Sequence, residues 1–152
     1  MPPQLPRDAK APARMRDLAT WLLSRSYARS NAVLHERFEA SGSGLRPYHY
    51  RLLASVEEEG PIGQADLGRV SGIDRSDVAN LLAELEQLGF VERTVDPNNR
   101  RRNIIAISAA GRAQLLALDH VIDEAQERVL APLSPNERRQ LAKLLHKLSD
   151  TD

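Results

Sequence analysis

The 152-residue sequence contains no cysteine. This absence excludes disulfides, thiolate-bound zinc, iron–sulfur clusters and any nucleophile or redox switch that depends on a thiol. Aromatic residues make up only 4% of the chain, so a core has to rest on Leu, Val, Ile and Ala. No apolar run approaches the roughly 20 residues that a membrane span needs. The first residues hold no apolar segment typical of a signal peptide, and we expect a cytoplasmic protein.

The sequence also lacks a net charge, since 21 basic residues balance 21 acidic ones. The charges are nevertheless segregated along the chain. Residues 93–102 hold four arginines and one aspartate, a net charge of +3, whereas residues 113–152 hold five basic and seven acidic residues, a net charge of −2. DNA binding requires only a local basic surface. Overall neutrality therefore does not exclude a nucleic-acid ligand.

Sequence motifs of catalysis are missing as well. The chain has no nucleophile elbow, no phosphate-binding glycine loop and no plausible catalytic triad. Its three consecutive glutamates, residues 57–59, are interpreted as the solvated end of a helix. The four histidines have no spacing typical of metal ligands. We therefore expect a protein that is not an enzyme and has neither a cofactor nor a metal site.

Apolar spacing predicts a mainly α-helical chain. Residues 1–12 carry four prolines and are interpreted as a flexible arm. One domain is expected over residues 13–152. Helices are expected at about residues 13–38, 47–59, 63–71, 74–88, 108–131 and 134–148. In the third helix Leu67 and Val70 are expected to face the core.

The helix that follows Asp74 has the clearest pattern. Its apolar residues recur at the i, i+3, i+4, i+7 spacing of an amphipathic helix, at Val78, Leu81, Leu82, Leu85 and Leu88. Asp74 is the expected N-cap, and Gly89 is expected just past the C-terminus of the helix.

A β-hairpin is predicted directly after this helix. Residues 90–95 are rich in strand-forming side chains, residues 96–99 have turn chemistry, and residues 102–107 form the expected returning strand. The loop is expected to be longer than the tight two-residue type. Ser108 is expected to cap the next long helix, and Ser134 to Glu137 form a capping box.

A short helix, a turn, a longer helix and a basic hairpin are the elements of a DNA-binding unit. The second helix of a helix-turn-helix lies in the major groove, where side chains read base edges. Arginines at a narrow hairpin tip can enter the minor groove or neutralise phosphates. The predicted DNA-contacting residues are Arg75, Ser76, Asp77, Ala79, Asn80, Arg93, Arg100, Arg101 and Arg102. Asp74 and Asp77 have an alternative role as helix caps, and an arginine triplet alone is often a solvated turn.

Three segments resemble the wing signature of the MarR family of transcriptional regulators. They are Leu-Gly-Phe-Val-Glu-Arg at 88–93, Asp-Pro-Asn-Asn-Arg-Arg at 96–101 and Ile-Ala-Ile-Ser-Ala-Ala-Gly at 105–111. The resemblance implies a mainly α fold with a small β-hairpin wing, in which residues 46–111 form a winged helix-turn-helix. Residues 13–45 and 112–152 are then dimerisation helices. By position, Arg101 matches the arginine that the family commonly places in the minor groove.

Two positions depart from the family pattern. Asn99 replaces the second aspartate of the wing, which weakens an ionic tie, and Asn80 stands where the family frequently has arginine. The operator preference of relatives therefore does not transfer to this chain.

The resemblance implies a sequence-specific regulator of transcription. We expect a repressor that binds a pseudo-palindromic site on double-stranded DNA as a homodimer. Release by a small aromatic or anionic effector is a further implication of the family. The candidate ligand residues are Trp21, Tyr27, His35, Tyr48 and His49, with packing as the alternative for each. A winged-helix module for protein interaction is the alternative function, favoured if acidic neighbours pair with Arg100–Arg102.

Overall fold

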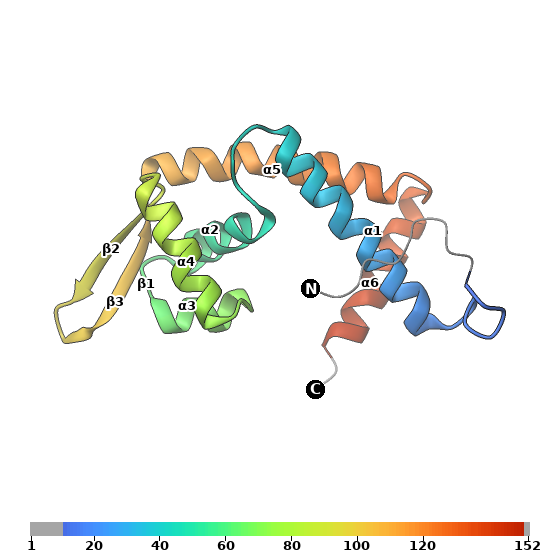
Figure 1. The fold of residues 1–152 in the computed structure, drawn as a ribbon, viewed down its shortest axis with the longest axis horizontal. Helices are drawn as coiled ribbons and strands as arrows, with labels where there is room; N and C mark the ends of the chain where they lie inside the picture. The colour runs from blue at the N-terminus through green and yellow to red at the C-terminus, as the bar shows by residue number, and fades with distance from the viewer. Residues whose placement is uncertain (1–10, 151–152) are drawn as a thin grey trace. The chain divides into compact units, whose positions relative to one another are not determined.

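The computed structural model describes residues 11–150 of the chain (Figure 1). Its elements are α1 (Ala19–Ala40), α2 (Pro47–Glu59), β1 (Ile62–Gly63), α3 (Gln64–Ser71), α4 (Arg75–Gln87), β2 (Val91–Asp96), β3 (Asn99–Ile107), α5 (Ala109–Leu130) and α6 (Pro135–Ser149). The predicted mainly α fold with a β-hairpin is confirmed. The predicted flexible arm lies outside the described residues except for its last two. Within the described range no helix has the length and apolar character of a membrane span.

The chain divides into two compact units. One unit, residues 37–122, holds α2, α3, α4 and the sheet, together with the end of α1 and the first part of α5. The other unit combines the chain up to Glu36 with the chain from Asp123 onward, and so contains most of α1, the end of α5 and α6. Each has its own apolar surface and its own polar contacts.

The core of the 37–122 unit is built from aliphatic side chains and Phe38, in agreement with the low aromatic content. Its buried apolar residues are Phe38, Leu45, Leu52, Leu53, Val56, Leu67, Ile73, Val78, Leu81, Leu82, Leu85, Val91, Ile105, Ile107 and Leu118. Burying one leucine fully contributes about 1.5–3 kcal/mol. The apolar face predicted for α4 is confirmed at four of its five positions, Val78, Leu81, Leu82 and Leu85.

Two predicted core positions are wrong. Leu88 is 53% exposed, because α4 ends at Gln87 and the chain turns at Gly89, whose φ is +76°. Val70 is 52% exposed. Leu67 and Ser71 form the buried face of α3 instead, and Ile73 beyond the helix joins the core.

The three strands form one antiparallel sheet in the order β1-β3-β2. Ile62 and Gly63 of β1 pair with Ile105 and Ile104 of β3. This two-residue strand was not predicted, because a segment so short has no periodicity. In the sheet, β3 therefore lies between β1 and β2.

The hairpin turn differs from the prediction. β3 begins at Asn99, three residues earlier than expected, and Asp96 pairs with Asn99 across a two-residue connection. The register then shifts, because Val95 pairs with Asn103. The expected longer loop is wrong, since the three arginines belong to an irregular part of the strand and not to the loop.

The predicted helix starts are confirmed for α2, α5 and α6, but α1 begins at Ala19 and not at residue 13. The Ser108 hydroxyl accepts a hydrogen bond from the amide of Gly111 at 3.0 Å. In α6 the Ser134 hydroxyl accepts from the Glu137 amide, and the Glu137 carboxylate accepts from the Ser134 amide at 2.8 Å. These bonds to Ser134 lower the pKa of Glu137. The capping box is therefore formed as predicted.

Candidate nucleic-acid interface

The helices α3 and α4 are joined by a tight turn. Gly72 ends α3 in the left-handed conformation, with φ +63° and ψ 28°, which disfavours residues with a Cβ. Ile73 then enters the core, and Asp74 takes the N-cap position of α4. The Asp74 side chain makes no capping hydrogen bond in this structure, so its predicted capping role is met by position only.

The helix α4 has an apolar face in the core and a polar face on the surface. Val78, Leu81, Leu82 and Leu85 are each 4% exposed or less. The predicted reading positions of α4 are all exposed, namely Arg75, Ser76, Asp77, Ala79 and Asn80. No ion pair involves Arg75 within residues 11–150. This face is therefore available to an external ligand.

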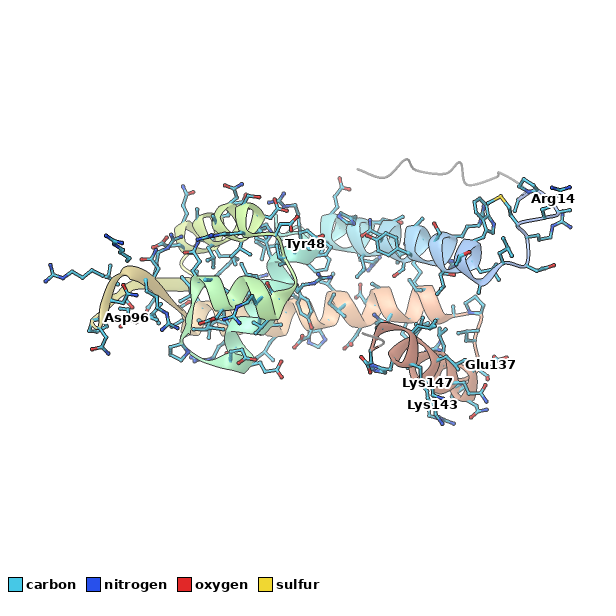
Figure 2. All side chains as sticks on the ribbon, turned by 90° about the horizontal axis from the view of Figure 1, so that it is seen from below. Arg14, Tyr48, Asp96, Glu137, Lys143 and Lys147 are labelled. Atoms are coloured by element: carbon cyan, nitrogen blue, oxygen red, sulfur yellow. The ribbon has the colours of Figure 1, made fainter. Side chains whose placement is uncertain are left out.

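The hairpin β2–β3, hereafter the wing, carries Arg100 and Arg101 on its surface. Figure 2 shows Asp96 at the tip of the wing, beyond the helices of its unit. Polar side chains order this tip: Asp96 Oδ1 accepts from the Asn98 amide at 2.9 Å, and Asn99 Oδ1 accepts from the Arg101 amide at 3.1 Å. In the part of the chain that the structure describes, no carboxylate pairs with Arg100 or Arg101.

The two other predicted wing contacts are already paired with carboxylates. Nη2 of Arg102 donates to Oδ2 of Asp66 at 3.0 Å, and its Nη1 lies 3.6 Å from Oδ2 of Asp96. Arg93 Nε lies 3.3 Å from Oε2 of Glu86 on α4. Among the described residues, Arg93 and Arg102 are thus paired with carboxylates, whereas Arg100 and Arg101 are not.

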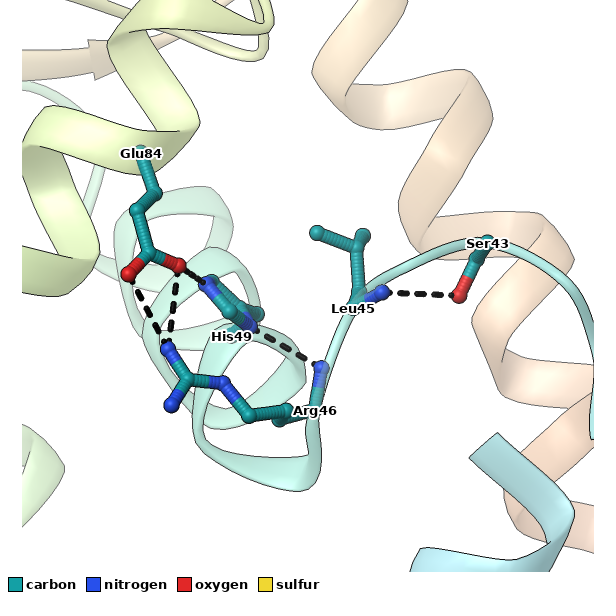
Figure 3. A network of polar contacts seen from close by, with 5 residues as sticks. All are labelled: Ser43, Leu45, Arg46, His49 and Glu84. Atoms are coloured by element: carbon teal, nitrogen blue, oxygen red, sulfur yellow. Dashed lines mark hydrogen bonds and ion pairs between the residues drawn. The ribbon is translucent and has the colours of Figure 1, made fainter. Parts of the chain in front are cut away.

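A polar network that the sequence did not predict joins α2 to α4 (Figure 3). His49 is buried, and its Nδ1 accepts a hydrogen bond from the backbone amide of Arg46 at 2.9 Å. Nε2 therefore carries the ring proton and donates it to Glu84 Oε2 at 2.7 Å. Arg46 Nη2 also donates to both Glu84 oxygens, at 3.1 and 3.0 Å.

The network lowers the pKa of Glu84, while burial lowers the pKa of His49. Burial lowers the pKa of His49, and the hydrogen bond to Glu84 only partly opposes this effect. The hydrogen bond from His49 lowers the pKa of Glu84, and Arg46 lowers it further. The sequence held a signal only for the bond between His49 and the Arg46 amide, because a histidine three residues after the N-cap can act like the acidic residue of a capping box.

The predicted ligand residues belong to two different units. Trp21, Tyr27 and His35 lie on α1 in one unit, where Tyr27 is 65% exposed and Trp21 is stacked with Arg25. Tyr48 and His49 lie on α2 in the other unit. Both ring nitrogens of His49 are hydrogen bonded within the protein. A ligand-binding role for these side chains stays a prediction.

The fold and the surface together define a class of protein, the winged helix-turn-helix DNA-binding proteins. A MarR family model matches residues 45–102. A probable transcriptional regulator from Pseudomonas aeruginosa is 32% identical in sequence. Its crystal structure superposes with a TM-score of 0.78, over 89% of this chain and 99% of that one.

A further relative agrees with the family, and a further solved structure agrees with the fold. The transcriptional repressor NicR of Pseudomonas putida is 26% identical over 131 residues, which are 86% of this chain and 82% of NicR. BpsR of Bordetella bronchiseptica has a TM-score of 0.81 at 23% identity, over 93% of this chain and all of BpsR. The chain belongs to the MarR family and is a transcriptional regulator.

Proposed function

We propose that this regulator binds double-stranded DNA sequence-specifically as a homodimer and represses transcription from a pseudo-palindromic operator. In this proposal, residues 46–111 form the winged helix-turn-helix. Residues 13–45 and 112–152 supply the dimerisation helices. The observation that supports this proposal best is that Arg100 and Arg101 on the wing pair with no carboxylate among the described residues. The same unit exposes the polar face of α4.

In the proposed complex, α4 lies in the major groove. There Arg75 donates to guanine, Asn80 pairs with adenine, and Asp77 accepts from the amino group of cytosine. Ser76 and Ala79 lie on the same exposed part of the helix. A correct bidentate contact discriminates against the wrong base by about 1–3 kcal/mol.

The wing supplies the sequence-independent part of binding. Arg101 enters the minor groove, where the negative potential is focused, and Arg100 neutralises a flanking phosphate. Neither guanidinium has to leave an internal carboxylate first, because the described residues hold both unpaired. Arg93 is tied to Glu86 and orients the wing against α4.

Dimerisation is supported by the apolar surface of the terminal helices. An apolar groove is lined by Leu23 of α1 and by residues of α6 that include Leu145 and Leu148. These three leucines are 41% to 60% exposed in the single chain. Burying them against a second copy removes apolar area from water. Two recognition helices about 34 Å apart then meet successive major grooves.

Release by a small effector is supported by relatives. The DNA binding of BpsR is regulated by 6-hydroxynicotinic acid. By analogy we propose an aromatic or anionic effector for this chain. The candidate ligand residues are those predicted from the sequence, Trp21, Tyr27, His35, Tyr48 and His49. Isothermal titration with 6-hydroxynicotinic acid tests the proposal, and binding that also lowers affinity for DNA supports it.

The alternative of a protein-interaction module requires an arginine cluster neutralised by the protein itself. Only Arg102 of the three meets that condition among the described residues. DNA binding is therefore the function that the wing supports best.

The decisive experiment is a mobility-shift titration with the DNA upstream of the protein's own coding region, repeated across a salt series. We expect tight, salt-sensitive binding by the wild type, because each neutralised phosphate releases counterions. Arg101→Ala is expected to weaken binding about tenfold and to reduce the salt dependence. Arg139→Ala on α6 is the control that removes an equal charge outside residues 46–111. Equal behaviour of both variants would contradict the proposed interface.

A further inference from the structure

Arg102 connects three elements of its unit through one guanidinium group. Its hydrogen bond to Asp66 reaches the first turn of α3, and its ion pair with Asp96 reaches the end of β2. The side chain remains 47% exposed. A single residue of the wing thus contacts the first helix of the helix-turn-helix.

Gly63 in β1 provides the space that this guanidinium occupies. A Cβ at position 63 would lie 2.6 Å from Nε and 2.7 Å from Nη2 of Arg102, closer than such atoms approach in real proteins. The backbone of Gly63 has φ −64° and ψ 141°, which any residue adopts. A side chain at position 63 would therefore displace the guanidinium of Arg102, although the backbone conformation there suits any residue.

The backbone pairing of the wing is irregular where the arginines lie. The pairs Val95–Asn103 and Asp96–Asn99 leave residues 100–102 of β3 without a matching stretch on β2. A bulged segment is less constrained by the ladder than a regular one. The bonds from the Arg102 side chain to Asp66 and Asp96 restrain this bulged segment in place of regular strand pairing.

We propose that Arg102 is a positioning residue of the wing and not a DNA contact. Its contacts with Gly63, Asp66 and Asp96, here called the wing anchor, fix the bulged segment so that Arg100 and Arg101 face the DNA. The wing anchor also supplies an ionic tie in a wing that has Asn99 where the family has an aspartate. The inference rests on the proposed function, in which the wing binds DNA.

Arg69 also pairs with Asp66, so both proteins compared carry Arg69→Ala. In that background the charge on Asp66 separates the two roles of Arg102, because the roles predict opposite changes in DNA affinity. Asp66→Asn removes a negative charge near DNA. If Arg102 bound a phosphate, this change would tighten binding. If Arg102 anchors the wing, the change weakens binding about two- to fivefold, the range typical of an exposed ion pair. Fluorescence anisotropy with an operator fragment measures the difference, and tighter binding overturns the inference.

The salt dependence gives a second readout that a loss of packing alone does not move. Arg102→Ala is expected to weaken binding while the slope of log affinity against log salt stays at the wild-type value. A lost phosphate contact would lower that slope by about 0.9 for each contact. A slope reduced in this way in Arg102→Ala overturns the inference, whereas Arg101→Ala is expected to show the reduction.

Gly63→Ala tests the space beneath the guanidinium. The added methyl group displaces Arg102, so we expect binding to weaken about as much as in Asp66→Asn. In an Arg102→Ala background the same methyl group meets no guanidinium and is expected to have no further effect. Additive losses in this double-mutant cycle would overturn the inference. Thermal unfolding of each variant checks that the fold is retained.

Amide hydrogen exchange of residues 99–104 distinguishes a failure of the wing anchor from a failure of the proposed function. Asp66→Asn is expected to speed exchange there in the absence of DNA, and unchanged exchange overturns the wing anchor. If exchange speeds up while Arg101→Ala binds DNA like the wild type, the wing anchor stands and the proposed role of the wing in DNA binding fails.

Discussion

At the scale of single residues, His49 is the titratable group with the most specific environment. Its Nδ1 accepts a backbone amide and its Nε2 donates to Glu84, so the neutral ring meets both partners. Protonation would place a second proton on Nδ1, directly facing the donor amide of Arg46. Burial and this arrangement both favour the neutral ring, in agreement with the lowered pKa of His49.

The lowered pKa makes stability depend on pH. In the unfolded chain His49 has an ordinary pKa near 6.5, above its pKa in the folded protein. The unfolded state therefore binds more protons as the pH falls below about 6.5, and the free energy of unfolding decreases until the folded pKa is passed. Each unit of separation between the two pKa values corresponds to about 1.36 kcal/mol.

His49→Gln tests this dependence. Glutamine can accept from the Arg46 amide and donate to Glu84, but it does not titrate. Urea unfolding at pH 7.5 and pH 5.5 should show a smaller loss of stability in the variant than in the wild type. Other groups titrate in both proteins and cancel in the comparison. Equal losses would show that His49 does not contribute to the pH dependence.

At the scale of elements, the sequence predicted what local chemistry determines. The capping residues at Ser108 and Ser134 and the apolar stripe of α4 were readable, because each depends on neighbours within a few residues. The strand β1 and the true start of β3 were not readable. The strand β1 depends on pairing between Gly63 and Ile104, which are distant in sequence. The start of β3 depends on the irregular register in which Asp96 pairs with Asn99 and Val95 with Asn103, and no local periodicity indicates it.

The same distinction applies to the candidate site. The exposed face of α4 and the arginine cluster of the wing were identified from spacing. The separation of Arg102 from Arg100 and Arg101 was not, because it requires Asp66 to lie within 3.0 Å of the guanidinium. The link between His49 and Glu84 joins residues 35 positions apart, beyond the reach of any helical period.

The capping box of α6 offers a prediction at this scale. Ser134→Ala removes the acceptor for the Glu137 amide and is expected to destabilise the protein by about 0.5–2 kcal/mol. Ser149→Ala is the matched control at the other end of α6, where the hydroxyl only donates to the His146 carbonyl. Urea unfolding at one fixed protein concentration measures both. A loss no larger than in the control would contradict a stabilising role for the capping box.

At the scale of the whole molecule, the proposed dimer makes mass a direct test. The wild type is expected to sediment as a particle of twice the 16.9 kDa chain mass. Leu145→Glu places a charge in the apolar groove and is expected to shift the equilibrium to the single chain, because burying an unpaired charge is unfavourable. DNA affinity should fall with it, since two recognition helices bind together.

Leu88→Glu, just past the end of α4, is the control for this change, because Leu88 is 53% exposed and lies outside the proposed dimerisation helices. We expect it to leave the mass unchanged. A wild type that sediments at 16.9 kDa, at concentrations well above those of DNA binding, would contradict the dimer. A similar shift in both variants would mean that the groove has no special role.

Trp21 is the only tryptophan of the chain, and it lies on α1 outside the unit that carries α4 and the wing. Its indole emission therefore reports on one unit without background from the other. Coupling between the units is reciprocal in free energy. A change in Trp21 emission on addition of operator DNA would thus reveal that DNA binding is felt in the terminal helices. The fluorescence of the unmodified protein can therefore be used to measure coupling between DNA binding and the terminal helices.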